Sequence, residues 1–193
     1  LRDEIIFTID GEDTKDIDDA VSITKDEVGN YILGVHIADV SHYVRPGTAL
    51  DREALHRGNS TYLVDRVLPM LPEKLSNGLC SLRPGEDKLT RAAIMTFNAK
   101  GHRTGQRFVN AVIHSKRRYT YEEAMASLQT EPGHDPDAKL LHRAWKLASL
   151  IRRGRFANGS LDMQFTEVKV VLDAAGHPVR FARIAYDESH QLI

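Results

Sequence analysis

The sequence predicts a mixed α+β fold, in which a curved sheet or partly open β-barrel carries helices on its outside. Three observations support this prediction. Apolar and polar residues alternate over short stretches in the first half of the chain, as they do in strands. In the second half, apolar residues recur at the spacing of an amphipathic helix. With 193 residues, of which 41% are hydrophobic, the chain can bury the core of one domain.

The alternating stretches define the expected strands, and turn-forming residues join three pairs of them into hairpins. These turns lie at residues 27–30, 99–101 and 173–176. The expected strands are residues 4–9, 19–25, 31–38, 92–98, 106–114, 163–172 and 179–184.

A capping box predicts the first helix of the second half. Thr120 is followed three residues later by Glu123, so each side chain can bond to the backbone of the other residue. This helix would run to about residue 129. Near the end of the chain, Asp187 is expected to cap another helix.

The longest helix is predicted to begin at Asp135 and Pro136, because proline is favoured at the first helical position. It would run to about Arg153, and Gly154 and Gly159 would bracket its exit. Its apolar face would consist of Leu140, Leu141, Ala144, Trp145, Ala148 and Ile151.

Four aspartates fall within ten residues near the start of the chain. They are Asp10, Asp16, Asp18 and Asp19 in the run TIDGEDTKDIDDAVSI, which we expect to form a loop between two strands. Like charges held this close repel each other and raise each other's pKa unless a cation or hydrogen-bond donors compensate them. A hard divalent cation with oxygen ligands would provide that compensation.

Two other interpretations of this acidic run are an acidic surface loop and a calcium loop. An acidic surface loop needs no ion at all. A calcium loop of the EF-hand type is excluded, because Lys15 stands where that loop needs glycine and Val21 where it needs a bidentate glutamate. The remaining interpretation is a magnesium or manganese carboxylate site of the kind that serves phosphoryl and nucleotidyl chemistry.

His36, Asp39 and His42 have a spacing that could also suit a metal triad. We favour structural roles for all three. His36 falls inside an expected strand, Asp39 can cap the turn that follows, and His42 can satisfy backbone groups of the loop.

Five motifs in chain order carry a resemblance to a known family. They are the D-x5-D-x-D-D cluster, GVHIADVSHYV at 34–44, GNSTYLVDRVLPMLPEKLSNGLCSL at 58–82, KRRYTYEEA at 116–124 and DESHQLI at 187–193. Together they resemble the catalytic RNB domain of the RNase II and RNase R exoribonucleases, and the sequences of the first and third motifs are slightly closer to RNase R. The resemblance implies hydrolysis of single-stranded RNA from its 3′ end, with release of nucleoside 5′-monophosphates.

The chemistry of the carboxylate cluster suggests a role for each member. Asp10, Asp16 and Asp19 are expected to hold Mg²⁺, with Mn²⁺ as a substitute. Asp18 is expected to position or deprotonate the attacking water.

Five further residues are candidates for RNA binding. Tyr62 resembles the family tyrosine that stacks on a base near the RNA 3′ end, and Tyr121 resembles a second tyrosine that grips the terminal nucleotide. Phe165 is a candidate for the other half of the base clamp, and Arg117 and Arg118 for the RNA path. Packing in the core is the alternative for the aromatic residues, and a solvated surface for the basic ones. Further basic candidates are Lys116, Arg152, Arg153 and Arg155.

Composition excludes several classes of protein. The sequence has no apolar run long enough for a membrane span and no signal peptide, and a single cysteine, Cys80, rules out an internal disulfide framework. These features suit the cytoplasm. The net charge of −1 is low for a protein that binds RNA phosphates. Oligonucleotide-binding-fold domains flank the catalytic domain in the family and could supply the missing positive charge.

The chain opens with Leu1 and stops within a family motif. We therefore expect residues 1–193 to be part of an RNB catalytic domain, truncated at its C-terminal end and nearly inactive alone. Two alternatives remain: a catalytically inactive RNB-type module that binds RNA or a protein, and a metal-independent phosphodiesterase that uses histidine pairs. The sequence leaves the oligomeric state open.

Overall fold

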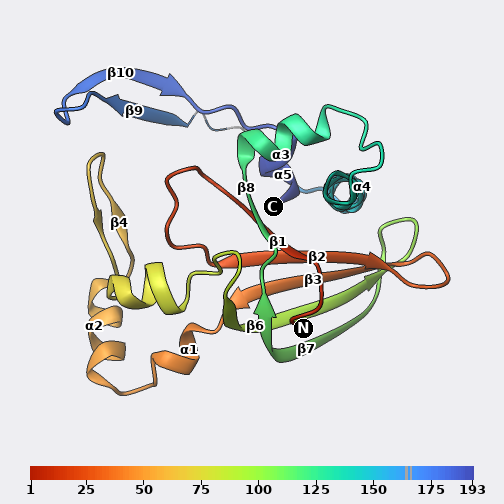
Figure 1. Ribbon diagram of the computed structural model, residues 1–193, viewed down its shortest axis with the longest axis horizontal. Coiled ribbons are helices and arrows are strands. Elements are labelled where there is room, and N and C mark those ends of the chain that lie inside the picture. Colours follow the sequence, from red (N-terminus) through yellow and green to blue (C-terminus); the bar gives the residue numbers. More distant parts are fainter. Residues whose placement is uncertain (164, 166) are drawn as a thin grey trace.

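A six-stranded open sheet forms the centre of the computed structural model, which describes residues 1–163, 165 and 167–193 (Figure 1). The strand order is β7-β6-β3-β2-β1-β8, and every pair is antiparallel except β1 and β8. The predicted α+β fold with an incompletely closed sheet is confirmed. The strands are β1 (Ile6–Asp10), β2 (Asp19–Lys25), β3 (Tyr31–Ala38), β6 (Asp87–Phe97), β7 (Arg103–His114) and β8 (Arg117–Thr120).

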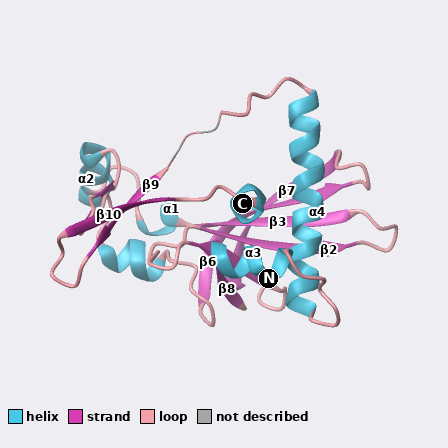
Figure 2. Cartoon of the chain, turned by 90° about the horizontal axis from the view of Figure 1, so that it is seen from above, coloured by secondary structure: helices cyan, strands magenta, loops and turns pink. Residues whose placement is uncertain are grey.

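The longer helices of the second half cover one face of this sheet, and two small hairpins lie at one end of it. Figure 2 shows the longest helix, α4, crossing the strands. Both hairpins, β4–β5 and β9–β10, lie at the end of the molecule that also carries α2 (Figures 1 and 2). The helices are α1 (Val40–Tyr43), α2 (Ala49–Arg57), the π-helical turn η1 (Leu75–Leu79), α3 (Tyr121–Leu128), α4 (Pro136–Ala157) and α5 (Glu188–Leu192). The hairpin strands are β4 (Thr61–Tyr62), β5 (Val67–Leu68), β9 (Val168–Leu172) and β10 (Pro178–Arg183).

The predicted strands of the first half are confirmed, and β2 and β3 have the predicted bounds. The hairpin of β6 and β7 also forms, but both of its strands extend beyond the predicted segments. Strand β8 was not predicted, because its sequence RRYT has no apolar alternation. It is a strand because it pairs in parallel with β1, a contact that local sequence cannot show.

Helix α4 begins as predicted, with Asp135 as N-cap and Pro136 in the first turn, but it ends later than expected. Gly154 lies inside the helix, where a glycine costs only about 1 kcal/mol relative to alanine. The helix stops at Asn158, and Gly159 follows with a φ of +89° that glycine adopts without strain. The helix therefore ends between Gly154 and Gly159, as predicted, but beyond the expected end at about Arg153.

The predicted N-terminal caps of α3 and α5 are confirmed. Thr120 and Glu123 form the complete capping box of α3, and the Asp187 side chain accepts a hydrogen bond from the Ser189 backbone at the start of α5. The last predicted hairpin forms as well, although β9 begins at Val168 rather than at residue 163. The part of that prediction on residues 164 and 166 lies outside the described residues.

The two faces of the sheet bury separate apolar clusters, because successive side chains of a strand point to opposite faces. One cluster lies beneath α3 and α4 and the other beneath the segment around η1. The helix-side cluster contains Phe7, Ile9, Val21, Ile23, Tyr31, Phe97, Tyr119, Ala124, Leu140, Leu141, Ala144 and Leu147. The opposite cluster contains Ile6, Ile17, Ala20, Ala38, Leu71, Leu75, Cys80, Leu82 and Ile113.

His36 is fully buried and has a structural role, as predicted. Its Nε2 lies 3.0 Å from Ser22 Oγ, and this hydroxyl donates to Glu4 Oε2 at 3.1 Å. Because the only serine proton is used toward Glu4, His36 Nε2–H is the donor to Ser22. Burial lowers the pKa of His36 to about 4. Gly34 leaves room for this network, since a Cβ there would collide with Ser22 and His36.

Asp39 occupies the N-cap position of α1, but its carboxylate makes no capping bond. It accepts instead from Ser41 Oγ at 2.6 Å and from Arg91 Nε at 3.2 Å. The predicted side-chain cap by Asp39 was therefore wrong.

Among the described residues, no helix has both the length and the apolar composition that crossing a membrane requires.

Candidate active site

The acidic run forms the connection between the neighbouring strands β1 and β2, as predicted. Asp10 is the last residue of β1 and Asp19 the first residue of β2. Residues 11–18 join them, and we call this segment the carboxylate loop. Asp16 and Asp18 lie within it, so a rigid sheet fixes both ends of the loop that carries them.

The four carboxylates of this region repel one another in a partly desolvated setting. Burial, and next the charge of Asp19, raise the pKa of Asp10 to about 6. Desolvation also raises the pKa of Asp19. The Asp18 side chain has an accessible surface, yet desolvation on its inner side and the charges of Asp16 and Asp19 raise its pKa too. A cation would relieve this repulsion.

The donor set fits a hard divalent cation, because all of its members are carboxylates. Asp10 Oδ2 is buried and has no hydrogen-bond partner, which leaves a free ligand oxygen. Within the described part of the chain, however, no three His, Cys, Asp or Glu side chains are grouped so that they could hold a metal ion. We therefore expect ion binding to change the rotamer of at least one of these aspartates.

Tyr62 connects the β4–β5 hairpin to the carboxylate loop. Its hydroxyl donates to Asp16 Oδ2 at 2.5 Å, while 63% of the residue stays exposed. This hydrogen bond, and after it desolvation, raise the pKa of Tyr62 to about 12. Tyr62 is therefore not a core residue, and its ring is accessible beside the aspartates.

Tyr121 is the first residue of α3 and packs partly against the helix-side cluster. Its ring stacks on the His190 ring, with centroids 4.0 Å apart and planes 7° from parallel. Asp187 Oδ1 lies 2.9 Å from His190 Nδ1 and orients that ring. His190 was not predicted as a site residue, although the motif DESHQLI contains it.

Phe165 and Arg117 are two further candidates for RNA binding. Phe165 is 80% exposed, and among the described residues no ring contact joins it to Tyr62. Arg117 pairs with Asp137 at 2.8 Å and lies over the Tyr119 ring. Their contacts with RNA stay predictions.

Arg118 contacts the carboxylate loop itself. Its Nη2 donates to the backbone carbonyl oxygens of Gly11 at 2.6 Å and Glu12 at 2.9 Å. Arg118 therefore braces the first half of the loop, a role that sequence could not indicate because the partners are backbone atoms. Its proposed contact with RNA also stays a prediction.

Comparison with known proteins identifies the family. A family model described as the RNB domain matches residues 1–193. The chain belongs to the RNB domain family. Ribonuclease R of Thermotoga maritima is 48% identical over 183 residues, which are 93% of this chain and 26% of that protein. Ribonuclease R of Escherichia coli (strain K12) is 42% identical over 197 residues, which are 100% of this chain and 24% of that protein. The RNB chain thus spans about a quarter of the length of these relatives.

Solved structures give the same family. RNase R of Mycoplasma genitalium in complex with ribose methylated single-stranded RNA superimposes with a TM-score of 0.90 and 32% identity, over 100% of this RNB chain and 30% of that one. Yeast Ssd1, described as a pseudonuclease, has a TM-score of 0.72 at 20% identity over 81% of this chain and 19% of its own. The second likeness shows the fold alone.

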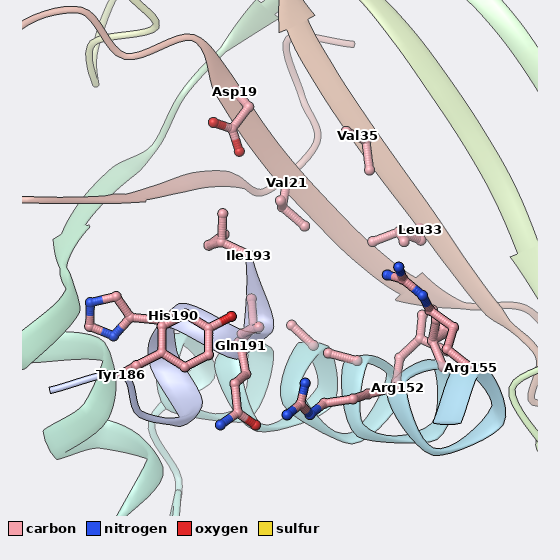
Figure 3. Close-up of a pocket in the computed structure, with 15 residues that line it drawn as sticks. Asp19, Val21, Leu33, Val35, Arg152, Arg155, Tyr186, His190, Gln191 and Ile193 are labelled. Atoms are coloured by element: carbon pink, nitrogen blue, oxygen red, sulfur yellow. The ribbon is translucent and has the colours of Figure 1, made fainter. Parts of the chain in front are cut away.

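A cavity of about 390 Å³ lies between the sheet and helices α4 and α5 of the RNB chain. Asp19 lines it, and Figure 3 shows its carboxylate on the β2 wall, across the cavity from Tyr186 and His190. Arg152 and Arg155 from α4 line the same space (Figure 3). One side of the carboxylate cluster is therefore open to a cavity with basic groups at its other end.

Proposed function

We propose that this chain is part of a magnesium-dependent 3′→5′ exoribonuclease that hydrolyses single-stranded RNA to nucleoside 5′-monophosphates. The observation that supports it most is the group of four aspartates at the facing ends of β1 and β2 and in the carboxylate loop between them, where burial and neighbouring charges raise the pKa of Asp10 and Asp18. Relatives named ribonuclease R, at 42–48% identity, support the same activity.

In this proposal each residue has a defined task. Asp10, Asp16 and Asp19 would hold Mg²⁺, or Mn²⁺ in its place. The bound ion supplies an electrophile for the phosphate and lowers the pKa of water. Asp18 would accept the proton of the attacking water. Tyr62 would stack on a base of the substrate.

We also propose the molecular context of this chain. Residues 1–193 would be part of a longer RNB catalytic domain, with oligonucleotide-binding-fold domains elsewhere in the polypeptide and the cytoplasm as its compartment. The share of each relative that the chain covers, about a quarter, supports this view. We call the full polypeptide that contains this chain the intact protein.

Incubation of the intact protein with 5′-labelled single-stranded RNA and Mg²⁺ tests the function. We expect the label to shift progressively to shorter products, with nucleoside 5′-monophosphates released, and a blocked 3′ end to prevent the shift. Internal cleavage of the 3′-blocked RNA would contradict the exonucleolytic mode, and release of the 5′ label as a mononucleotide from the start would contradict the proposed polarity. RNA binding without any product would instead indicate an inactive module.

Tyr62→Ala is expected to lengthen the final product by one or more nucleotides while the initial rate changes little. Base stacking is worth about 1–3 kcal/mol per base, so its loss releases short RNA earlier. The final products are measured on a sequencing gel.

Tyr62→Phe is the matched control, because it keeps the ring and removes only the hydrogen bond to Asp16. It should give products of wild-type length. If Tyr62→Ala also gave wild-type products, the stacking role would be refuted.

A further inference from the structure

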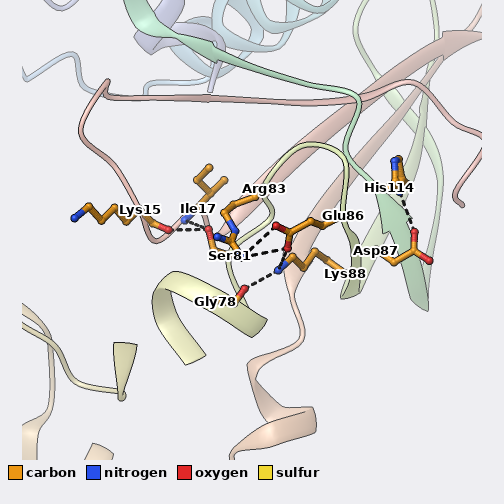
Figure 4. A network of polar contacts seen from close by, with 9 residues as sticks. All are labelled: Lys15, Ile17, Gly78, Ser81, Arg83, Glu86, Asp87, Lys88 and His114. Atoms are coloured by element: carbon orange, nitrogen blue, oxygen red, sulfur yellow. Dashed lines mark hydrogen bonds and ion pairs between the residues drawn. The ribbon is translucent and has the colours of Figure 1, made fainter. Parts of the chain in front are cut away.

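Ser81 contacts the carboxylate loop at the two residues that flank Asp16. Its hydroxyl donates to Lys15 O at 2.7 Å and accepts from Ile17 N at 3.3 Å (Figure 4). Ser81 is 0% exposed, so no water can take over these bonds without a rearrangement. One side chain thus fixes the backbone on both sides of an aspartate that we propose as a metal ligand.

The segment after Ser81 strengthens this attachment. Leu82 N donates to Ile17 O at 2.9 Å, and Ile17 and Leu82 are both buried in the opposite cluster. At the end of the loop, Ala38 N donates to Asp18 O at 2.9 Å. The second half of the loop is therefore held by the chain around Ser81 and by β3, as Arg118 holds its first half.

A buried lysine attaches the π-helical turn that precedes Ser81 to the sheet. Lys88 in β6 donates from Nζ to Gly78 O in η1 at 2.6 Å and pairs with Glu86 at 2.8 Å (Figure 4). Cys80 N closes the π-helical turn by donating to Leu75 O at 2.9 Å. These contacts fix the turn that immediately precedes Ser81 in the chain.

We propose that Ser81 is a positioning residue of the active site, whose hydroxyl holds the backbone of Lys15 and Ile17 so that the Asp16 and Asp18 carboxylates are presented together. It touches neither the substrate nor the reacting atoms. This inference rests on the proposed function, because it concerns the same carboxylates. Partners that orient the ligands of a metal commonly contribute 10-fold to 100-fold to its affinity, roughly.

The test compares Ser81→Ala with wild type in the intact protein. Binding of Mn²⁺ alone, followed by the electron paramagnetic resonance signal of the free ion, should weaken about tenfold. Hydrogen exchange of the Ile17 amide should accelerate, because this amide loses its acceptor. RNA hydrolysis at low Mg²⁺ should fall and recover at high Mg²⁺, while the KM for RNA stays unchanged.

Ser22→Ala is the matched control. Like Ser81→Ala, it removes a buried hydroxyl that makes two hydrogen bonds. The partners of Ser22 are the Glu4 and His36 side chains rather than the backbone of the loop. It should lower the melting temperature to a similar extent and leave Mn²⁺ affinity and Ile17 exchange unchanged. If Ser81→Ala does not fold, Ser81→Cys under reducing conditions keeps a weaker donor and acceptor and should show the same changes to a smaller degree.

The outcomes separate this inference from the proposed function. Wild-type Mn²⁺ affinity in both Ser81 variants would overturn the positioning role while leaving the metal site intact. If wild type itself binds no Mn²⁺ and hydrolyses no RNA, the proposed function fails, and the role of Ser81 in presenting a metal site fails with it. Equal weakening of Mn²⁺ binding in Ser22→Ala would show that Ser81 acts only through stability.

Discussion

Asp18→Asn in the intact protein is expected to lower the rate of RNA hydrolysis by about 10²–10⁴-fold, the usual contribution of general base catalysis. Asparagine has nearly the shape of aspartate but cannot accept the proton of the attacking water. Asp18 is also not among the proposed metal ligands. RNA affinity, measured by fluorescence anisotropy with labelled poly(A), should therefore stay within about threefold of wild type, which is less than one lost hydrogen bond would cost.

The control for this substitution is Asp13→Asn in the same loop. The Asp13 side chain is 84% exposed, and its ion pair with Lys169, at 3.1 Å, lies on the surface. An exposed pair of this kind contributes little to stability, so Asp13→Asn should have wild-type activity. Digestion of poly(A) by Asp18→Asn at the wild-type rate would show that another group activates the water.

Removal of divalent metal should abolish hydrolysis, the second large effect that we expect. The reason is that the proposed ligands, Asp10, Asp16 and Asp19, only repel the RNA phosphate when no cation is bound. EDTA in excess is expected to reduce nuclease activity below detection, and added Mg²⁺ to restore it. The release of labelled nucleotide measures both steps.

EDTA that has been saturated with Mg²⁺ beforehand is the control, because it exposes the protein to the chelator without removing the ion. It should leave activity unchanged. Full activity in free EDTA would favour the alternative mechanism, in which histidine pairs hydrolyse RNA without a metal.

The sequence predicted best those elements whose pattern is local. Strands β2 and β3 have clear apolar alternation, and Thr120 with Glu123 forms a capping box, so their bounds agree with the structure. The segment from residue 40 to residue 82 was assigned no elements, although it contains α1, α2, β4, β5 and η1. These elements are short, and the described parts of α1 and α2 bury no residue, so periodicity gives almost no signal there.

The site was predictable in composition but not in geometry. Four aspartates in ten residues indicated a carboxylate site, and their place between two strands follows from the flanking apolar residues. Ser81 and Arg118 hold the loop through backbone atoms that are 66 and 107 residues away in the chain, respectively. A bond from a side chain to a distant backbone leaves no pattern in the sequence. The same reason explains why Arg118 was predicted only as a possible RNA contact.

The parallel pairing of β1 with β8 has a consequence for the order in which this protein folds during synthesis. Arg118, which lies in β8, and its acceptor Gly11 are 107 residues apart. At about 5–20 residues per second, the ribosome needs roughly 5–20 s to make the chain between them. During that time the outer edge of β1 has no strand beside it, and the first half of the loop lacks its brace. The nascent chain can form β1, β2 and β3 early, but the first half of the carboxylate loop gains its brace from Arg118 only after β8 has left the ribosome.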